Sequence, residues 1–163
     1  MSLTLTIGKK IIYPSQGPCL INSIVQKSIG EGSISFYQLL VLHEGGGDLF
    51  FPVDKAQAAG MRPLLQKSEI PKLLTQLKRK PLSDTNYRDR ARNNLKLMAS
   101  GSAFDLAEVV ESLTELRETK SLSFSEHKML EKARGLLVCE ISEVMGESKA
   151  ASEARVDKAL EML

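Results

Sequence analysis

The hydrophobic pattern of the sequence changes near Gly60, and this change constrains the fold more than any other feature. Before Gly60, short apolar runs alternate with glycine-rich turns, which is typical of antiparallel strands. After Gly60, apolar residues recur about every third or fourth position, which is typical of amphipathic helices. We therefore predict the α+β class, with a β domain at residues 1–64 followed by an all-α domain at residues 65–163.

Tight turns divide the first part into about four or five strands. The turn sequences PSQGP, GEG and GGGD separate expected strands at residues 10–13, 19–25, 34–42 and 49–53. So many short strands in one small domain predict an open barrel of the SH3 or Tudor type. Glycine-rich turns can also cradle phosphate, but GEGS and GGGD lack the Lys-Ser/Thr pair and the following helix of a P-loop.

Helix-start and helix-stop residues divide the second part into a bundle of about five helices. Ser123 and Glu126 form a capping box, and Gly146 is a stop signal for the helix that they begin. Asp84 is the expected N-cap of the second helix, and Ser102 is that of the third. The expected helices are residues 68–78, 84–101, 102–120, 123–146 and 148–163.

The stretch NYRDRARNNLKLMASG, residues 86–101, is the most informative about function. Arg88, Arg92 and Lys96 recur at i, i+4 and i+8, so they form one cationic stripe of a helix. A docked helix with a cationic face and Tyr87 at its start suits a nucleic-acid backbone, although an ordinary solvated face would have the same pattern. The apolar residues that would dock this helix are Ala91, Leu95 and Met98.

The formal net charge of +2 hides an asymmetry along the chain. Residues 1–64 carry a net charge of +1, residues 65–100 carry +6 and residues 101–163 carry −5. A binding surface for a polyanion is therefore expected in the middle block, and the acidic end argues against a protein that simply coats DNA.

The sequence lacks the marks of several function classes. No apolar run approaches the roughly 18 residues of a membrane span, and MSLTLTIGKK does not have the pattern of a secretory signal. Cys19 and Cys139 fall in segments of different type, so we expect two buried, reduced thiols in a cytoplasmic protein. Without metal-ligand spacing or a nucleophile–base pair, we predict no metal, no cofactor and no catalysis. The alternative is an enzyme that uses Cys19 or His43 as a reactive group.

Four segments resemble the CarD/CdnL family. GKKIIYPSQGPCLINSI resembles the family's opening signature, GD-x-V-x-YP-x-x-G, which begins a Tudor-like barrel that transcription-repair coupling factor also contains. DLFFPVDKAQAAGMRP resembles the last strand and its exit, and NYRDRARNNLKLMASG resembles the signature of the helical domain. LAEVVESLTELRETKSLSFSEHKMLEKARGLL resembles the next part of that domain, so the resemblance covers residues 6 to about 145 in the family's order.

The resemblance implies a bacterial transcription regulator and not an enzyme. Proteins of this family bind the β subunit of RNA polymerase through the barrel. They contact promoter DNA at the upstream edge of the transcription bubble through the helical domain, largely without sequence preference. We therefore expect a monomer that stabilises the open promoter complex, with the housekeeping sigma factor as a further expected partner.

The resemblance also assigns roles to individual residues of the barrel. Lys27 falls where the family often has a basic contact to the β subunit, whereas Phe50 falls where another basic contact is expected. The departure at Phe50 indicates a more apolar contact made by Phe50 or Phe51 with Tyr37. The alternative is that these aromatic rings fill the barrel, although adjacent residues of one strand point to opposite faces.

In the helical domain, Tyr87 matches the position of a family tryptophan that wedges into the minor groove at the bubble edge. A tyrosine offers less stacking area and a polar tip, and its ring could instead pack on Ala91. The implied phosphate contacts on the same helix are Arg88, Arg90, Arg92 and Lys96. The implied contacts on a later helix are His127, Lys128 and Lys132.

The missing tryptophan and the altered barrel contact leave a second interpretation of the resemblance open. In that interpretation the protein is an adaptor that docks on RNA polymerase and recruits another protein through its acidic later helices. The adaptor predicts that removing Tyr87, Arg88 and Arg92 leaves function intact.

Overall fold

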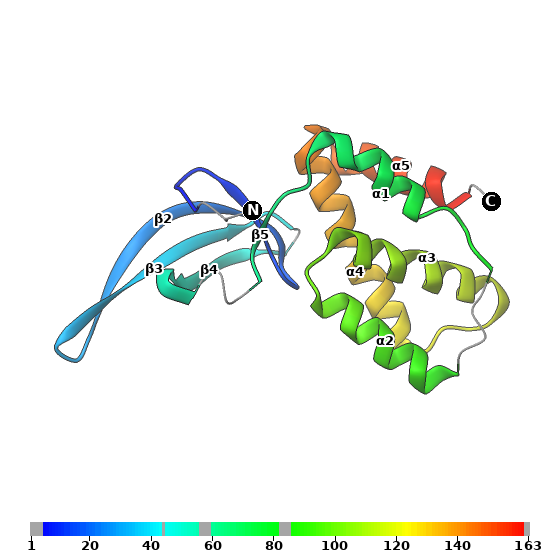
Figure 1. Ribbon diagram of the computed structural model, residues 1–163, viewed down its shortest axis with the longest axis horizontal. Coiled ribbons are helices and arrows are strands. Elements are labelled where there is room, and N and C mark those ends of the chain that lie inside the picture. The colour runs from blue at the N-terminus through cyan, green and yellow to red at the C-terminus, as the bar shows by residue number, and fades with distance from the viewer. Residues whose placement is uncertain (1–4, 44, 56–59, 82–85, 162–163) are drawn as a thin grey trace. The chain divides into compact units, whose positions relative to one another are not determined.

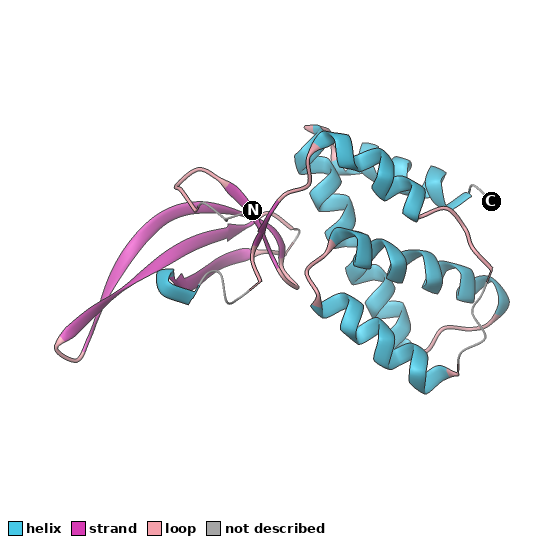
Figure 2. Ribbon diagram, in the orientation of Figure 1, coloured by secondary structure: helices cyan, strands magenta, loops and turns pink. Residues whose placement is uncertain are grey.

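The chain divides into two compact units, Met1–Leu64 and Leu65–Leu163, each treated by itself. The computed structural model describes residues 5–43, 45–55, 60–81 and 86–161. The first unit consists mainly of strands and the second consists of helices (Figures 1 and 2), which confirms the α+β class.

The first unit is a five-stranded antiparallel sheet with the strand order β4-β3-β2-β1-β5. A short 3₁₀ turn, η1, Val53–Lys55, follows β4. The core of this unit contains Ile11, Cys19, Ile21, Leu39 and Met61. The strands are β1, Lys10–Tyr13, β2, Gly17–Ile29, β3, Gly32–Val41, β4, Gly47–Pro52, and β5, Arg62–Pro63.

The hairpin of β2 and β3 is longer than the sequence predicts. Gly30, with φ 62°, lies in the turn, and the ladder continues to the pair of Ile29 and Gly32. The polar run Gln26–Ser28 suggests a loop in the sequence, whereas both faces of a two-stranded ribbon can carry polar residues. Beyond Ile21, the described residues provide no strand on the other side of β2, so this flank is an open edge.

A β-bulge in β2 decides which side chains face outward. The register shifts between Ile21 and Ser23, so that Ile21 pairs with Leu39 and Ser23 pairs with Gln38. Before the bulge, odd-numbered residues of β2 point into the core, and after it they point outward, because one extra residue exchanges the two faces. Lys27 therefore lies on the outer face.

The described residues of the second unit form five α-helices, and α3 and α4 lie at its centre (Figure 1). The predicted capping box of Ser123 and Glu126 is present at the start of α4, and Gly146, with φ 66°, ends that helix. None of the described helices has the length and apolar character needed to cross a membrane. The helices are α1, Ile70–Gln76, α2, Tyr87–Ala99, α3, Ala103–Thr119, α4, Phe124–Met145, and α5, Lys149–Glu161.

The first predicted helix begins later than expected. Ser68 lies in a 3₁₀ turn, η2, Lys67–Glu69, and the α-helix begins only at Ile70, with Pro71 in its first turn. The last helix, α5, is docked, because Val156 and Leu160 are buried in the core of the unit. The apolar positions of α3 lie in the same core, which includes Leu106, Val109, Val110, Leu113 and Leu116.

The apolar stripe expected for α2 is wrong in part. Leu95 is 62% exposed, whereas Asn94 is only 3% exposed, because the inward face of α2 lies one residue away from the expected line. The N-cap of α2 is Asn86, whose side chain accepts a hydrogen bond from the backbone of Asp89 at 2.9 Å. The expected cap, Asp84, lies outside the described residues.

The buried amide of Asn94 generates the first prediction. Its Nδ2 atom has no hydrogen-bond partner, and an unsatisfied buried donor costs about 1–3 kcal/mol. Asn94→Leu should therefore raise the free energy of unfolding, by about 1–2 kcal/mol in urea titrations. The exposed neighbour supplies the control: Asn93→Leu should stay within about 0.5 kcal/mol of wild type. A lower stability of Asn94→Leu would show instead that the buried amide stabilises the fold.

Candidate nucleic-acid and protein interfaces

The first turns of α2 and α4 are held against each other by one ion pair. The Nε atom of Arg90 lies 3.0 Å from Oε2 of Glu126, and the Glu126 side chain is only 6% exposed. Glu126 also accepts a hydrogen bond from the backbone of Ser123 as part of the capping box. One carboxylate therefore caps α4 and fixes α2 beside it.

The ionised state of Glu126 is favoured in the fold. Burial alone would raise the pKa of this carboxyl, but hydrogen bonds from the Ser123 backbone and from Arg90 outweigh it. The pKa of Glu126 therefore lies below its usual range. This carboxylate stabilises the fold at neutral pH and loses that contribution in acid.

Tyr87, the first residue of α2, does not pack into the core. Its side chain is 51% exposed, and the guanidinium of Arg90 lies 5.4 Å from the ring centroid. Hydrogen bonds from Ser123 and Ser125 lower the pKa of the Tyr87 hydroxyl. The ring thus lies beside Arg90 and is largely open to solvent.

The cations of α2 fall into two groups. Arg88, Arg92 and Lys96 are exposed along one stripe, as their spacing predicts. Arg90 is different, because it points toward α4 and is bound to Glu126. Three of the four expected phosphate contacts on this helix therefore face solvent.

The expected contacts on α4, namely His127, Lys128 and Lys132, are all exposed. Sequence reasoning missed a fourth residue on this surface. Phe124, the first residue of α4, is 75% exposed, and the Nζ atom of Lys128 lies 4.7 Å from its ring centroid. A signal was present, since an aromatic at the first position after an N-cap lies outside the inward stripe of the helix.

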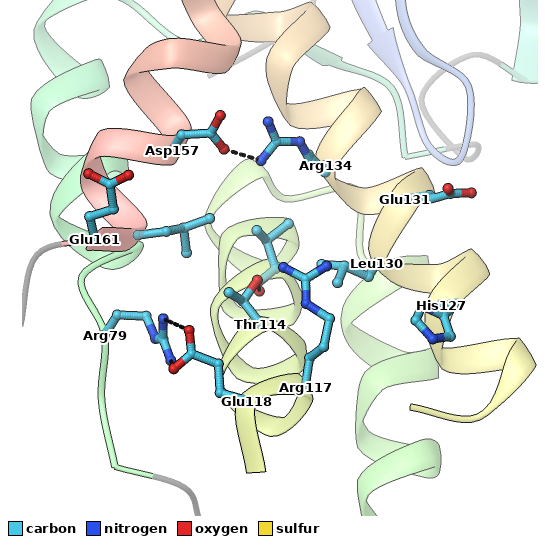
Figure 3. Close-up of a pocket in the computed structure, with 12 residues that line it drawn as sticks. Arg79, Thr114, Arg117, Glu118, His127, Leu130, Glu131, Arg134, Asp157 and Glu161 are labelled. Carbon is cyan, nitrogen blue, oxygen red and sulfur yellow. Dashed lines mark hydrogen bonds and ion pairs between the residues drawn. The ribbon is translucent and has the colours of Figure 1, made fainter. Parts of the chain in front are cut away.

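Other cations of the middle block are bound by acidic residues of α3. Arg79 pairs with Glu118 at 2.9 Å (Figure 3) and also with Glu115, and Lys80 pairs with Glu108 at 3.5 Å. The hydrogen bond that Arg79 donates to Glu118 is the main cause of a raised pKa at Arg79. The acidic third of the chain thus neutralises part of the basic block within the fold.

A cleft of about 750 Å³ lies among α3, α4 and α5, lined by residues of both charges. Arg134 pairs there with Asp157 at 2.7 Å, and Arg117 extends across the cleft (Figure 3). Glu118, Glu131 and further carboxylates on its walls would repel a phosphate backbone. His127, an expected phosphate contact, lies on the wall of this cleft, whereas Lys128 and Lys132 are not among its lining residues.

In the β unit, the outer face of the sheet carries a stacked cation. The Nζ atom of Lys27 lies 4.6 Å from the ring centroid of Phe50 and 5.6 Å from that of Phe36. Tyr37 and Phe51 face the core instead: Tyr37 is 8% exposed, and the ring of Phe51 packs against the core side. Each alternative thus holds for some of these aromatic residues: Phe50 is exposed on the outer face, whereas Tyr37 and Phe51 fill the core.

Of the two groups considered as reactive in the alternative enzyme, Cys19 is buried and His43 is partly exposed. Cys19 and Cys139 are both fully buried, and burial raises the pKa of the Cys139 thiol. Among the described residues, no group of three or more His, Cys, Asp or Glu side chains could hold a metal ion.

Comparisons with known proteins match both units. Residues 70–157 match the family model described as CarD, C-terminal domain, and residues 5–65 match the one described as CarD-like/TRCF RID domain. The chain is 26% identical over 152 residues to the putative transcription factor YdeB of Bacillus subtilis (strain 168). That alignment covers 86% of this chain and 92% of YdeB.

The Arg90–Glu126 pair generates a pH-dependent prediction. Glu126→Gln should lower the free energy of unfolding at pH 7 by about 1–3 kcal/mol, because Arg90 loses a charged acceptor. Because the Glu126 pKa is lower in the folded than in the unfolded chain, wild type should lose this contribution as pH falls below about 4.3. The free energy of unfolding of Glu126→Gln should therefore decrease less than that of wild type over the same acid range.

Urea titrations between neutral and acid pH measure this difference. Glu131→Gln, an exposed carboxylate on the same helix, is the control and should follow wild type at every pH. A Glu126→Gln profile parallel to that of wild type would show that the ion pair does not stabilise the fold.

Proposed function

This chain belongs to the CarD family of transcription factors, and we propose that it stabilises the open promoter complex by bridging RNA polymerase and DNA. The β unit binds the β subunit of the polymerase. The faces of α2 and α4 contact promoter DNA at the upstream edge of the bubble. The observation that carries the DNA half is the pair of exposed aromatic residues and cationic stripes at the joined starts of these helices.

The DNA contact rests on charge and on a fixed aromatic ring. Arg88, Arg92 and Lys96 are exposed and can approach phosphates, which gives affinity without sequence preference. Tyr87 presents an exposed ring beside Arg90, which is itself fixed by Glu126, and such a ring can insert beside a base step. Arg90 does not itself contact phosphate. It positions Tyr87 and α4 instead.

The polymerase contact uses the outer face and open edge of the β unit. Phe50 and Phe36 provide apolar area, and Lys27 provides a charge held between them. Tyr37 and Phe51 support this surface from the core side. The unpaired flank of β2 beyond Ile21 can accept an additional strand from a partner.

Because one chain makes both contacts, a weak affinity for DNA is enough to stabilise the open promoter complex. Once the β unit is bound, the DNA contact becomes effectively intramolecular. Stabilisation requires that the DNA face bind the opened promoter better than the closed one. The ring of Tyr87 meets this requirement, since it inserts most readily where bases are already unstacked. The housekeeping sigma factor and a monomeric state stay predictions.

The alternative is an adaptor that docks on the polymerase and recruits a protein without touching DNA. The cleft of mixed charge among α3, α4 and α5 favours it, because carboxylates and guanidinium groups side by side suit a protein surface. The two functions differ in which residues they need.

The lifetime of open promoter complexes after competitor challenge tests the proposal. With bacterial polymerase and its housekeeping sigma factor, the wild-type protein should lengthen the lifetime several-fold, as a coupling of about 1–3 kcal/mol implies. Tyr87→Ala and Arg88→Ala/Arg92→Ala should each remove most of this effect. An effect that all these variants retain would support the adaptor instead.

Binding to the isolated β subunit tests the polymerase contact. Phe50→Ala should weaken binding by about 5- to 100-fold, as expected for an exposed aromatic anchor, and Lys27→Ala should weaken it less. Ile24, an exposed apolar residue that pairs with the core residue Tyr37, supplies the control on the opposite face of the hairpin. If Ile24→Ala weakens binding more than Phe50→Ala does, the other face makes the contact.

A further inference from the structure

Phe124 is the most exposed large apolar side chain among the described residues, and no structural role accounts for it. The capping box at the start of α4 is formed by Ser123 and Glu126 without any contribution from its ring. A hydrophobic staple would join Leu122 to His127, the residues on either side of the first turn, and would not involve Phe124. An exposed ring at this position therefore calls for a partner outside the fold.

The surroundings of Phe124 repeat those of Tyr87. Each ring is the first residue of its helix, and each has a cation of the next turn beside it, Lys128 in one case and Arg90 in the other. The two rings belong to neighbouring helix starts, because Arg90, which lies beside the Tyr87 ring, is ion-paired with Glu126, two residues after Phe124. Two exposed aromatic rings are therefore presented on one surface.

The charged residues around this surface indicate which kind of partner it binds. Lys128 lies over the Phe124 ring, and Lys132 continues the same line one turn later, since Phe124, Lys128 and Lys132 recur at i, i+4 and i+8. Glu126, the carboxylate two residues after Phe124 in the sequence, is already bound to Arg90. An aromatic ring with cations beside it matches a nucleobase attached to its phosphate, which stacks on the ring while the cation meets the backbone.

We propose that Phe124 is a second base-stacking residue, which receives an unpaired base of promoter DNA while Tyr87 wedges at the last base pair. This proposal rests on the proposed function and adds single-stranded DNA to its ligands. Lys128 covers one side of the Phe124 ring, and the base takes the open side. Two rings on separate helices thus replace the larger stacking area that a single tryptophan would give.

Binding of the full-length protein to DNA probes at low salt tests the proposal. The probes are a fully paired duplex and a forked duplex of the same length with unpaired thymines on one strand. Wild type should bind the fork more tightly than the duplex. Phe124→Ala should lose roughly 5- to 150-fold in fork affinity, the range for one base–aromatic stack, with duplex affinity changed less than about twofold. Phe124→Trp should retain the preference for the fork.

The matched control is Leu95→Ala, another exposed apolar side chain on the same pair of helices, which should leave both affinities unchanged. Equal loss of duplex and fork affinity in Phe124→Ala would overturn the proposal, as would unchanged fork affinity. If fork affinity is unchanged but the lifetime of open complexes still falls, the ring meets a protein and the proposal fails.

Failure of the proposed function has a different signature. In that case wild type binds neither probe, Arg88→Ala/Arg92→Ala changes nothing, and open complexes are not stabilised. Thermal unfolding of Phe124→Ala should match that of wild type, because the removed ring contributes little buried area.

Discussion

The contact between Arg90 and Glu126 is the interaction on which the functional surface depends. It joins the start of α2 to the start of α4, and the same carboxylate completes the capping box of α4. Packing holds α2 less firmly than the other long helices, because its inward face contains Asn94 where an apolar residue would be expected. The ion pair therefore contributes to the fixed position of Tyr87 at the start of α2 relative to Phe124 at the start of α4.

The fold pairs part of the basic middle block of the sequence with its acidic last third. The acidic last third binds some of the basic middle block, with Glu115 and Glu118 holding Arg79 and Glu126 holding Arg90. Exposed cations remain on the outer stripes of α2 and α4, and also at Lys67, Lys72 and Lys78 of the middle block. A chain of net charge +2 can therefore still present local cationic stripes on α2 and α4.

Local signals in the sequence predicted the strands, the capping box at Ser123, the stop at Gly146 and the exposed stripe that begins at Arg88, because neighbouring residues determine each of them. The bulge after Ile21, which turns Lys27 outward, depends on pairing with β3 and could not be predicted from β2 alone. The pairing of Arg90 links residues distant in the sequence, so this cation was assigned to phosphate. The role of each exposed residue in binding stays a prediction, since the chain alone does not contain its partners.

In the proposed bridge, the β unit determines the affinity of the protein for RNA polymerase. The helical unit determines how much more tightly the protein binds the opened promoter than the closed one. The most direct test measures open-complex lifetime against protein concentration for wild type, Phe50→Ala and Arg88→Ala/Arg92→Ala. We predict that Phe50→Ala reaches the wild-type plateau at a higher concentration, whereas Arg88→Ala/Arg92→Ala has a lower plateau even at saturation. A wild-type plateau for Arg88→Ala/Arg92→Ala would contradict this division of work.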